Sequence, residues 1–430
     1  MTGAGTTEAY YDPFDFDIDD DPYPIWKRLR DEAPLYHNDK YNFYALSRYE
    51  DVAPELTNWE VYRSGHGTTM DIIMSNIDFP PGVILFEDPP IHDLHRRLLS
   101  RVFTPRRMEE IEPLTRDFCM RALDPLMGTG RFDFIENIGA MVPMRTIGYL
   151  LGIPEENQEE IRDRGGRQLT LKEGTFRPVP KDFLEHSHEM FADYVDWRVE
   201  HPSDDLMTQL LNAELEDREG TRRLTRTEVL LYVSMIAGAG NETTTRLIGF
   251  MGQLLSEHPD QRREIAQNPS LIPLAIEEVL RYEAPSPVQA RYVARDVECR
   301  GTTISEGSIM LLLNGSANRD ERKYPNAETF DIHRGAAHLS FGHGLHFCLG
   351  SALARMQARV VLEEVIKRWP DWEVDYANAT KAHTSSVRGW GRGARPRIQA
   401  GTFSTGTSWG YEAKNARRST SRSWARETRS

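Results

Sequence analysis

Apolar residues recur at helical spacing through the middle of the chain. Between residues 105 and 265 most apolar positions lie three or four residues apart, as on one face of an α-helix. Two such faces consist of Phe118, Ala122, Leu123 and Leu126, and of Ile147, Leu150 and Leu151. We therefore predict mainly helices over this region. Glycines and prolines interrupt the spacing at 165–180, where we expect a loop between helices.

Shorter segments outside this region show other patterns. Residues 25–30 have a helical pattern, whereas alternating positions over 41–53 predict a strand. Residues 64–90 are rich in Gly, Pro, Ser and Met without a clear period, which predicts an ordered but mobile loop. Further short strands are predicted at 288–293, 297–299 and 309–313. The predicted fold class is mainly α with small β-sheets.

Length and composition narrow the class of protein. The 430 residues include 39% hydrophobic and 27% charged residues, which is typical of an ordinary globular protein. Length alone would allow two or three domains. Residues 1–9 contain neither a basic nor an apolar segment, so we expect a disordered N-terminus and no secretory signal. No apolar run approaches the roughly 18 residues of a membrane span.

Charge and cysteine content restrict the partners. A formal net charge of −14 argues against nucleic acid as the main partner. The three cysteines, Cys119, Cys299 and Cys348, provide no disulfide framework, and we expect a reducing cytoplasm. Arg and Lys residues among Ser, Thr and Gly dominate residues 394–430, which predicts a basic, disordered tail.

Cys348 lies in an unusual local sequence. It ends the run Phe341-Gly-His-Gly-Leu-His-Phe-Cys348 and is followed by Leu349-Gly350. Glycines allow close approach of the backbone and positive φ. A helix starting just after Gly350 would place free N–H groups near the sulfur and favour the thiolate. This is how a chain would present a thiolate to a large flat cofactor; the alternative is a structural cysteine in a glycine-rich turn.

A second unusual sequence lies inside the helical run 228–255. Ala237-Gly-Ala-Gly-Asn-Glu-Thr-Thr-Thr245 places two glycines and three threonines near the middle of the helix. Glycine there costs about 1 kcal/mol relative to alanine, and threonine can bond the carbonyl four residues earlier and bend the helix. The pattern predicts a widened groove beside an acid–alcohol pair, Glu242 and Thr243. The alternative is a buried threonine-rich helix with an ion-paired glutamate.

These two sequences resemble motifs of the cytochrome P-450 superfamily, the haem-thiolate monooxygenases. Phe341-Gly-x-Gly-x-His-x-Cys348-x-Gly350 is similar to the haem-binding loop, and Ala239-Gly240-x-Glu242-Thr243 to the oxygen-activation motif. The resemblance covers about residues 10–392 and implies one large triangular, mainly helical domain over 10–393. It implies haem b with Cys348 as axial ligand. The residues expected beside the haem are Phe341, Gly342, Gly350, Ala239 and Gly240.

The resemblance also assigns roles to polar residues. Thr243 is expected to hydrogen-bond during oxygen activation and Glu242 to help bring protons from solvent. Asp-Pro-Pro-x-His92-x-x-x-Arg96 is similar to a family pattern that contacts the haem propionates. Arg291 and His346 are expected to do the same. His95 and Arg97 face elsewhere by spacing, and we expect them to be solvated.

A structural ion pair is expected from Glu278-Val-Leu-Arg281, whose charged residues lie three positions apart on a helix. Without context this would be a solvated surface pair. The resemblance implies instead a folding and haem-retention role, with Arg334 as the third member. Substrate contacts are expected from five residues by the layout of the family: Met235, Ile236, Ala239, Val288 and Val387.

The predicted function is insertion of one oxygen atom from O2 into a C–H bond of a hydrophobic small molecule: a steroid, terpenoid, fatty acyl chain or secondary metabolite. Electrons would come from NAD(P)H through a ferredoxin reductase and a ferredoxin. Two alternatives are a peroxygenase that uses hydrogen peroxide and a non-catalytic haem sensor. A zinc site at His343, His346 and Cys348 lacks the second ligand pair that structural zinc requires.

Overall fold

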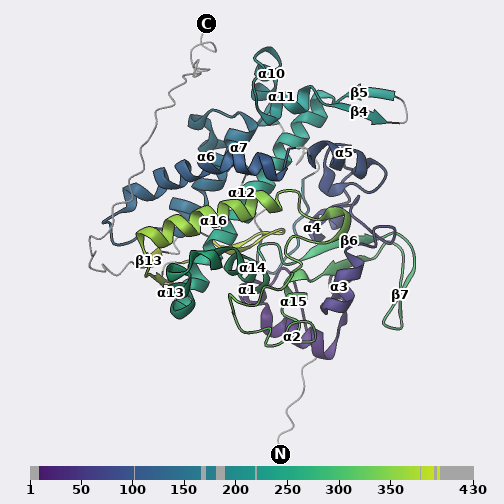
Figure 1. The fold of residues 1–430 in the computed structure, drawn as a ribbon. Helices are drawn as coiled ribbons and strands as arrows, with labels where there is room; N and C mark the ends of the chain where they lie inside the picture. The colour runs from purple at the N-terminus through teal and green to yellow at the C-terminus, as the bar shows by residue number, and fades with distance from the viewer. Residues whose placement is uncertain are drawn as a thin grey trace, which may run out of the picture. The chain divides into compact units, whose positions relative to one another are not determined.

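A long helix, α12 (Arg226–Glu257), forms the centre of the helical part of the structure (Figure 1). The computed structural model describes residues 9–100, 102–165, 171–180, 189–217, 220–377, 379–391 and 395–397. α12 begins with a capping box, in which the Thr225 hydroxyl accepts from the Glu228 N–H and the Glu228 carboxylate accepts from the Thr225 N–H. It packs against α7 (Met141–Leu151), the π-helical turn η3 (Phe134–Gly139) and α16 (Ser351–Arg368).

The other elements follow in chain order. The remaining helices and helical turns are α1 (Phe16–Asp20), α2 (Tyr23–Glu32), α3 (Tyr49–Glu55), α4 (Met70–Ser75), η1 (Ile84–Phe86), α5 (Ile91–Ser100), α6 (Pro105–Leu123), η2 (Asp124–Leu126), η4 (Glu155–Asn157), α8 (Gln158–Gly165), α10 (Ala192–Glu200), α11 (Leu206–Leu211), α13 (Pro259–Gln267), η5 (Pro269–Leu271), α14 (Ile272–Tyr282), α15 (Asn314–Ala317) and η6 (Gly344–His346).

One five-stranded sheet has the strand order β1-β2-β9-β6-β3. Its strands are β1 (Leu35–Asn38), β2 (Phe43–Leu46), β3 (Tyr62–Arg63), β6 (Gln289–Val293) and β9 (Ile309–Leu312), and only the β2–β9 pair is parallel. The two-stranded sheets pair β4 (Glu214–Asp217) with β5 (Gly220–Arg223), β7 (Val297–Cys299) with β8 (Thr302–Ile304), β10 (Glu373–Asp375) with β13 (Arg395–Arg397), and β11 (Lys381–His383) with β12 (Arg388–Trp390).

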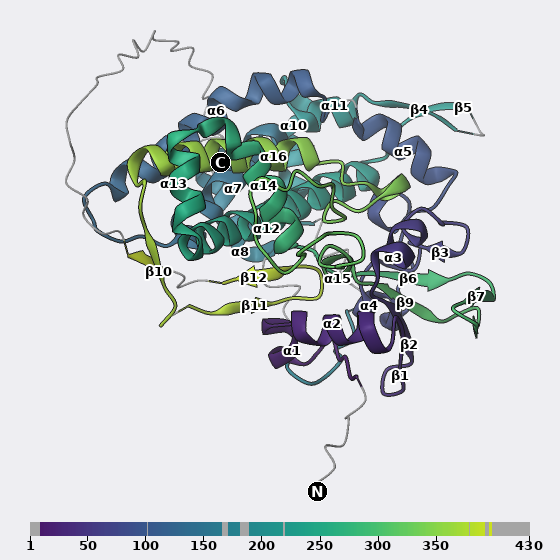
Figure 2. The same ribbon diagram turned by 60° about the horizontal axis from the view of Figure 1, so that its bottom comes forward.

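The first helices, strands β1 and β2 and the β11–β12 pair gather on one side of the helical bundle. In Figure 2, α1, α2, β1, β2, β11 and β12 lie below α12, whereas α6, α10, α11 and α16 lie above it. The largest buried cluster contains side chains from α6, α7, α12, α14 and α16, including the fully buried Val233, Ile248 and Leu255 of α12. The predicted class, mainly helical with small sheets, is confirmed.

Several local predictions were wrong because tertiary packing overrides local pattern. The expected strand over 41–53 is β2 followed by helix α3, whose first N–H, from Tyr49, is bound by the buried Asp320 carboxylate. The expected loop at 64–90 contains α4, because Met70, Ile72 and Ile73 are buried there. The hairpin of β4 and β5 interrupts the helical region, where no strand was expected.

The chain ends are only partly described. The predicted disordered N-terminus lies outside the described residues except Ala9, which is buried. The predicted tail also lies outside them, except that Arg395–Arg397 pair with β10 as strand β13. All described residues belong to one compact unit, Met1–Gln399. Within the described part of the chain, no helix combines the length and apolarity needed to cross a bilayer.

Candidate functional site

A cavity of about 1090 Å³ lies between the middle of α12 and the loop that carries Cys348. Ligand pockets usually enclose roughly 300–1,000 Å³, so this one has room for a large cofactor and a second molecule. The predicted cofactor, catalytic and substrate residues all line it: His92, Arg96, Met235, Ile236, Ala239, Gly240, Glu242, Thr243, Val288, Arg291, Phe341, Gly342, His346, Cys348, Gly350 and Val387. The structure therefore brings together segments that are far apart in sequence.

The cysteine loop is closed by its own backbone. The N–H of Cys348 donates to the carbonyl of Phe341 at 2.8 Å. Gly342 and Gly344 both have φ of +71°, a conformation that residues with a Cβ rarely adopt. Helix α16 starts at Ser351, so the thiol lies at the N-terminal end of an 18-residue helix. This geometry holds the thiol at the wall of the cavity.

The electrostatics of Cys348 only partly follow the prediction. Burial raises the pKa of the thiol above its ordinary value, while the Gly350 backbone, Arg96 and Arg355 act to lower it. The helix end therefore favours the thiolate as expected, but burial outweighs it in the protein alone. A coordinating metal cation deprotonates a thiol outright, so iron would supply the missing stabilisation.

Four basic side chains, His92, Arg96, Arg291 and His346, gather on the cavity wall near the Cys348 loop. Arg291 and His92 are buried, and the His92 and His346 rings lie 4.5 Å apart between centroids. Among the described residues, Arg96 donates to the carbonyl of Phe347 and Arg291 to that of Ala290, but neither guanidinium has a carboxylate partner. The Nε2 atoms of both histidines are buried without a hydrogen-bond partner.

Nearby carboxylates offset the burial of this cluster only in part, with Asp88 acting on Arg291 and Asp93 on His92. Burial lowers the pKa of Arg291 to about 10. Burial and then the charge of Arg291 lower the pKa of His346 to about 3. Burial also lowers the pKa values of His92 and Arg96. Two carboxylates at this position would reverse these shifts, so the donor set fits the propionates of a haem.

The acid–alcohol pair faces the same cavity from α12. The Thr243 hydroxyl donates to the Ala239 carbonyl at 2.8 Å. Because a hydroxyl has one proton, its remaining lone pairs can only accept. The Glu242 carboxylate accepts from Arg246 at 2.8 Å, and Arg246 also donates to the Trp390 carbonyl. Thr243 can thus hold a proton-bearing group, and Glu242 is held by a cation one helical turn away.

The two glycines in the middle of α12, Gly238 and Gly240, have different surroundings. A Cβ on Gly240 would lie 2.7 Å from Ile147 of α7, so glycine permits the two helices to approach closely. A Cβ on Gly238 would meet nothing within 4 Å, because that position faces open space. The predicted widened groove therefore coincides with Gly238, while Gly240 serves helix packing.

The predicted structural ion pair lies outside the cavity. Arg281 and Glu278 are buried and form two hydrogen bonds of 2.7 and 2.8 Å. Arg334 approaches the same carboxylate at 3.3 Å, and Arg281 also donates to the carbonyls of Asn318 and Ala327. The predicted partnership of the three residues is present, and the carboxylate is satisfied on several sides.

Sequence reasoning missed or misplaced several residues. His95 was expected to be solvated, but it is fully buried and bonds the Glu87 carboxylate at 2.8 Å, because α5 turns this side toward Tyr232. Arg97 is exposed, as expected. Arg246 was not singled out, although its position four residues after Glu242 is a signal for an ion pair.

Comparison with known proteins assigns the family. The family model of cytochrome P450 matches residues 172–385. The chain is 38% identical over 393 residues to cytochrome P450 123 of Mycobacterium tuberculosis, covering 90% of this chain and 96% of the relative. It is 34% identical over 329 residues to mycinamicin IV hydroxylase/epoxidase of Micromonospora griseorubida, covering 76% and 81%.

Similarity to solved structures leads to the same assignment. The structure of cytochrome P450 CYP109Q5 from Chondromyces apiculatus matches with a TM-score of 0.80 at 30% identity, covering 91% of this chain and 99% of that one. Together with the cavity between α12 and the Cys348 loop, these similarities show that the chain belongs to the cytochrome P450 family of haem-thiolate monooxygenases, which bind haem b and use dioxygen on hydrophobic substrates.

Proposed function

We propose that this monooxygenase inserts one oxygen atom into a C–H bond of a hydrophobic small molecule, with electrons from NAD(P)H delivered by a ferredoxin reductase and a ferredoxin. The observation that carries the proposal is the acid–alcohol pair on α12, which shares one cavity with Cys348. We place the enzyme in the cytoplasm, where its three thiols, all free, would stay reduced.

We assign haem binding to residues that line one cavity. Cys348 would ligate the iron, and His92, Arg96, Arg291 and His346 would pair with the propionates. The support is that neither guanidinium forms an ion pair among the described residues, and that the Nε2 atoms of His92 and His346 are buried without a hydrogen-bond partner. Bound haem supplies the redox-active iron at which dioxygen is reduced and an oxygen atom is transferred.

Proton handling is assigned to Thr243 and Glu242. With its own proton engaged by Ala239, the Thr243 oxygen accepts a hydrogen bond from a protonated species in the groove. Glu242 would exchange protons between solvent and this groove, since its side chain is 23% exposed and also lines the cavity. Its hydrogen bond to Arg246 must loosen for the carboxylate to turn inward.

The lining of the cavity supports a lipophilic substrate. Met144, Ile147, Leu231 and Met235 contribute apolar side chains near α12, and such walls bind mostly by excluding water from apolar surface. A relative named for hydroxylation and epoxidation of mycinamicin IV adds weight to a secondary metabolite. A compound library screened for a Soret shift in the resting enzyme tests this, because a substrate that displaces iron-bound water changes the spectrum.

Two experiments separate the proposal from its alternatives. Turnover with a reconstituted ferredoxin chain is compared with turnover on hydrogen peroxide alone; efficient activity only with peroxide would indicate a peroxygenase. Thr243→Ala is expected to lower product per NAD(P)H consumed and to raise peroxide release, whereas Thr243→Ser, which retains the hydroxyl, should preserve coupling. Unchanged coupling in Thr243→Ala would favour a haem protein that does not use this proton path.

A further inference from the structure

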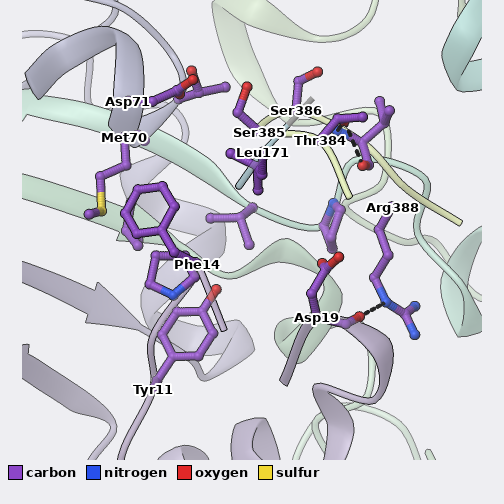
Figure 3. A pocket seen from close by; sticks show the side chains of 17 residues that line it. Tyr11, Phe14, Asp19, Met70, Asp71, Leu171, Thr384, Ser385, Ser386 and Arg388 are labelled. Carbon is purple, nitrogen blue, oxygen red and sulfur yellow. Dashed lines mark hydrogen bonds between the residues drawn. The ribbon is translucent and has the colours of Figure 1, made fainter. Parts of the chain in front are cut away.

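A second, smaller cavity of about 70 Å³ (Figure 3) adjoins the cavity between α12 and the Cys348 loop, called here the haem cavity. The two cavities share a wall, because the same side chains line both: Thr69, Val288, Ser385, Ser386 and Val387. This wall includes the end of the loop before α4 and the turn that joins β11 to β12. A molecule extending from the haem cavity between these two segments would reach the smaller one.

Three polar side chains of the smaller cavity lack partners. The Oγ1 of Thr69, the Oδ1 of Asp71 and the Oγ of Ser385 are buried atoms without a hydrogen bond. Asp71 is only 7% exposed and Thr69 only 9%. A buried polar atom left unsatisfied costs about 1–3 kcal/mol, and more when it is charged. In Figure 3 Asp71 and Ser385 both lie along the upper edge of the cavity.

The charges of the smaller cavity favour a hydrogen-bond donor. Its only cationic side chain among the described residues is Arg388, which is occupied by the Glu283 carboxylate at 2.6 Å and by the carbonyls of Asp19 and Asp20. The Asp19 carboxylate is itself occupied by His383 at 2.7 Å. Asp71 therefore remains as a carboxylate with an unsatisfied oxygen and no cation beside it in the cavity wall.

The rest of the smaller cavity is apolar. Tyr11, Phe14, Met70 and Leu311, which line it, are buried side chains of the cluster that packs on the sheet. Its volume of about 70 Å³ exceeds the roughly 10–15 Å³ that one water molecule needs, so a group of a few non-hydrogen atoms would fit. A small polar group attached to an apolar chain matches both the size and the chemistry, whereas an anion would be repelled by Asp71.

We propose that this cavity is a substrate subsite for a hydrogen-bond-donating group, a hydroxyl or an amine, at the end of an otherwise apolar molecule whose other end lies in the haem cavity. Asp71 accepts from this group, and Thr69 and Ser385 complete its hydrogen bonds. This inference rests on the proposed oxidation of a hydrophobic small molecule and adds the requirement for a polar end remote from the oxidised carbon.

Binding to the resting holoenzyme tests the subsite without any electron donor. The probes are decanol, dodecanol and tetradecanol, the methyl ethers of the same chains, and dodecanoate, each titrated by the Soret shift. The alcohols should bind about tenfold or more tightly than the ethers, because a hydrogen bond to a charged acceptor is strong. Dodecanoate should bind most weakly. Equal affinities for alcohols and ethers, or no shift with any probe, would overturn the proposal.

Variants locate the effect. Asp71→Asn should weaken dodecanol binding about tenfold and leave the ether unchanged, while Asp78→Asn, an exposed carboxylate nearby in the sequence, should change neither. Thr69→Val, which keeps the shape of the side chain, should also reduce alcohol binding. It replaces Asp71→Asn as the test if that variant is too unstable to isolate. Equal weakening of alcohol and ether would refute the subsite. Selective alcohol binding without turnover by the ferredoxin chain would contradict the proposed function but leave the subsite in place.

Discussion

Removing the charge of Arg291 should have opposite effects on the protein with and without haem. This guanidinium on β6 is 4% exposed, donates to the carbonyl of Ala290 and forms no ion pair among the described residues, although the charge of Asp88 offsets part of its burial. Burial lowers its pKa to about 10 from an ordinary value of 12.5. If propionates provide its counter-charge, the free-energy cost of burying the Arg291 charge should exist only when haem is absent.

The magnitude follows from this shift. At about 1.4 kcal/mol per pKa unit, the charge of Arg291 costs the haem-free protein about 3 kcal/mol. Because the folded pKa is the lower one, the cost is fully present below pH 10 and fades as the pH rises toward 12.5. Arg291→Leu removes this cost and loses one hydrogen bond worth about 1 kcal/mol. The haem-free variant should therefore be about 2 kcal/mol more stable than the parent.

The haem-bound protein should respond in the opposite sense. Breaking a buried ion pair by removing one partner typically costs about 3–5 kcal/mol, which corresponds to at least about hundredfold faster haem loss. The assay combines urea unfolding of the haem-free protein with haem transfer to excess apomyoglobin. Arg295→Leu, at an exposed side chain shortly after the same strand, is the control and should change neither. Unchanged haem transfer in Arg291→Leu, or destabilisation of both forms, would refute the reasoning.

Further predictions concern packing and pH. Gly240→Ala should leave the holoprotein about 1–3 kcal/mol less stable than Gly238→Ala, because only the Cβ at position 240 would lie 2.7 Å from Ile147. Gly238→Ala, in open space, should instead raise helix stability by up to about 1 kcal/mol; equal effects in denaturant unfolding would contradict this account. Although burial opposes it, the hydrogen bond from Arg355 lowers the pKa of Glu277 to about 2. The stability that this pair contributes should be complete above pH 4.5 and fall as the pH approaches 2. Glu277→Gln should therefore weaken the dependence of the unfolding free energy on pH in this range. An unchanged dependence in the variant would exclude the pair as its cause.

Features encoded in short stretches of sequence could be predicted. The long α12 follows from its apolar spacing, and the threonines and glycines near its middle mark the position where it lines the cavity. The Cys348 loop could be found from its glycines, two of which have positive φ. The partnership of Glu278 with Arg281 follows from helix spacing. In each case neighbouring residues determine the geometry.

Features that depend on distant packing could not be predicted. The buried state of His95 follows from Glu87 and Tyr232, which reach it from other elements. Helix α4 has no helical period, and its burial against the sheet side stabilises it. The favourable effect of the helix end on the Cys348 thiolate was predicted, but the net rise of its pKa was not, because the degree of burial cannot be read from local sequence.

The axial thiolate is the central claim, and the spectrum of the reduced holoprotein under carbon monoxide tests it most directly. A thiolate opposite the gas gives the strongly red-shifted Soret band after which the family is named. That band should be present in the parent and in Cys299→Ser, whose thiol does not line the haem cavity, and absent in Cys348→Ser. A band that persisted in Cys348→Ser would contradict the account.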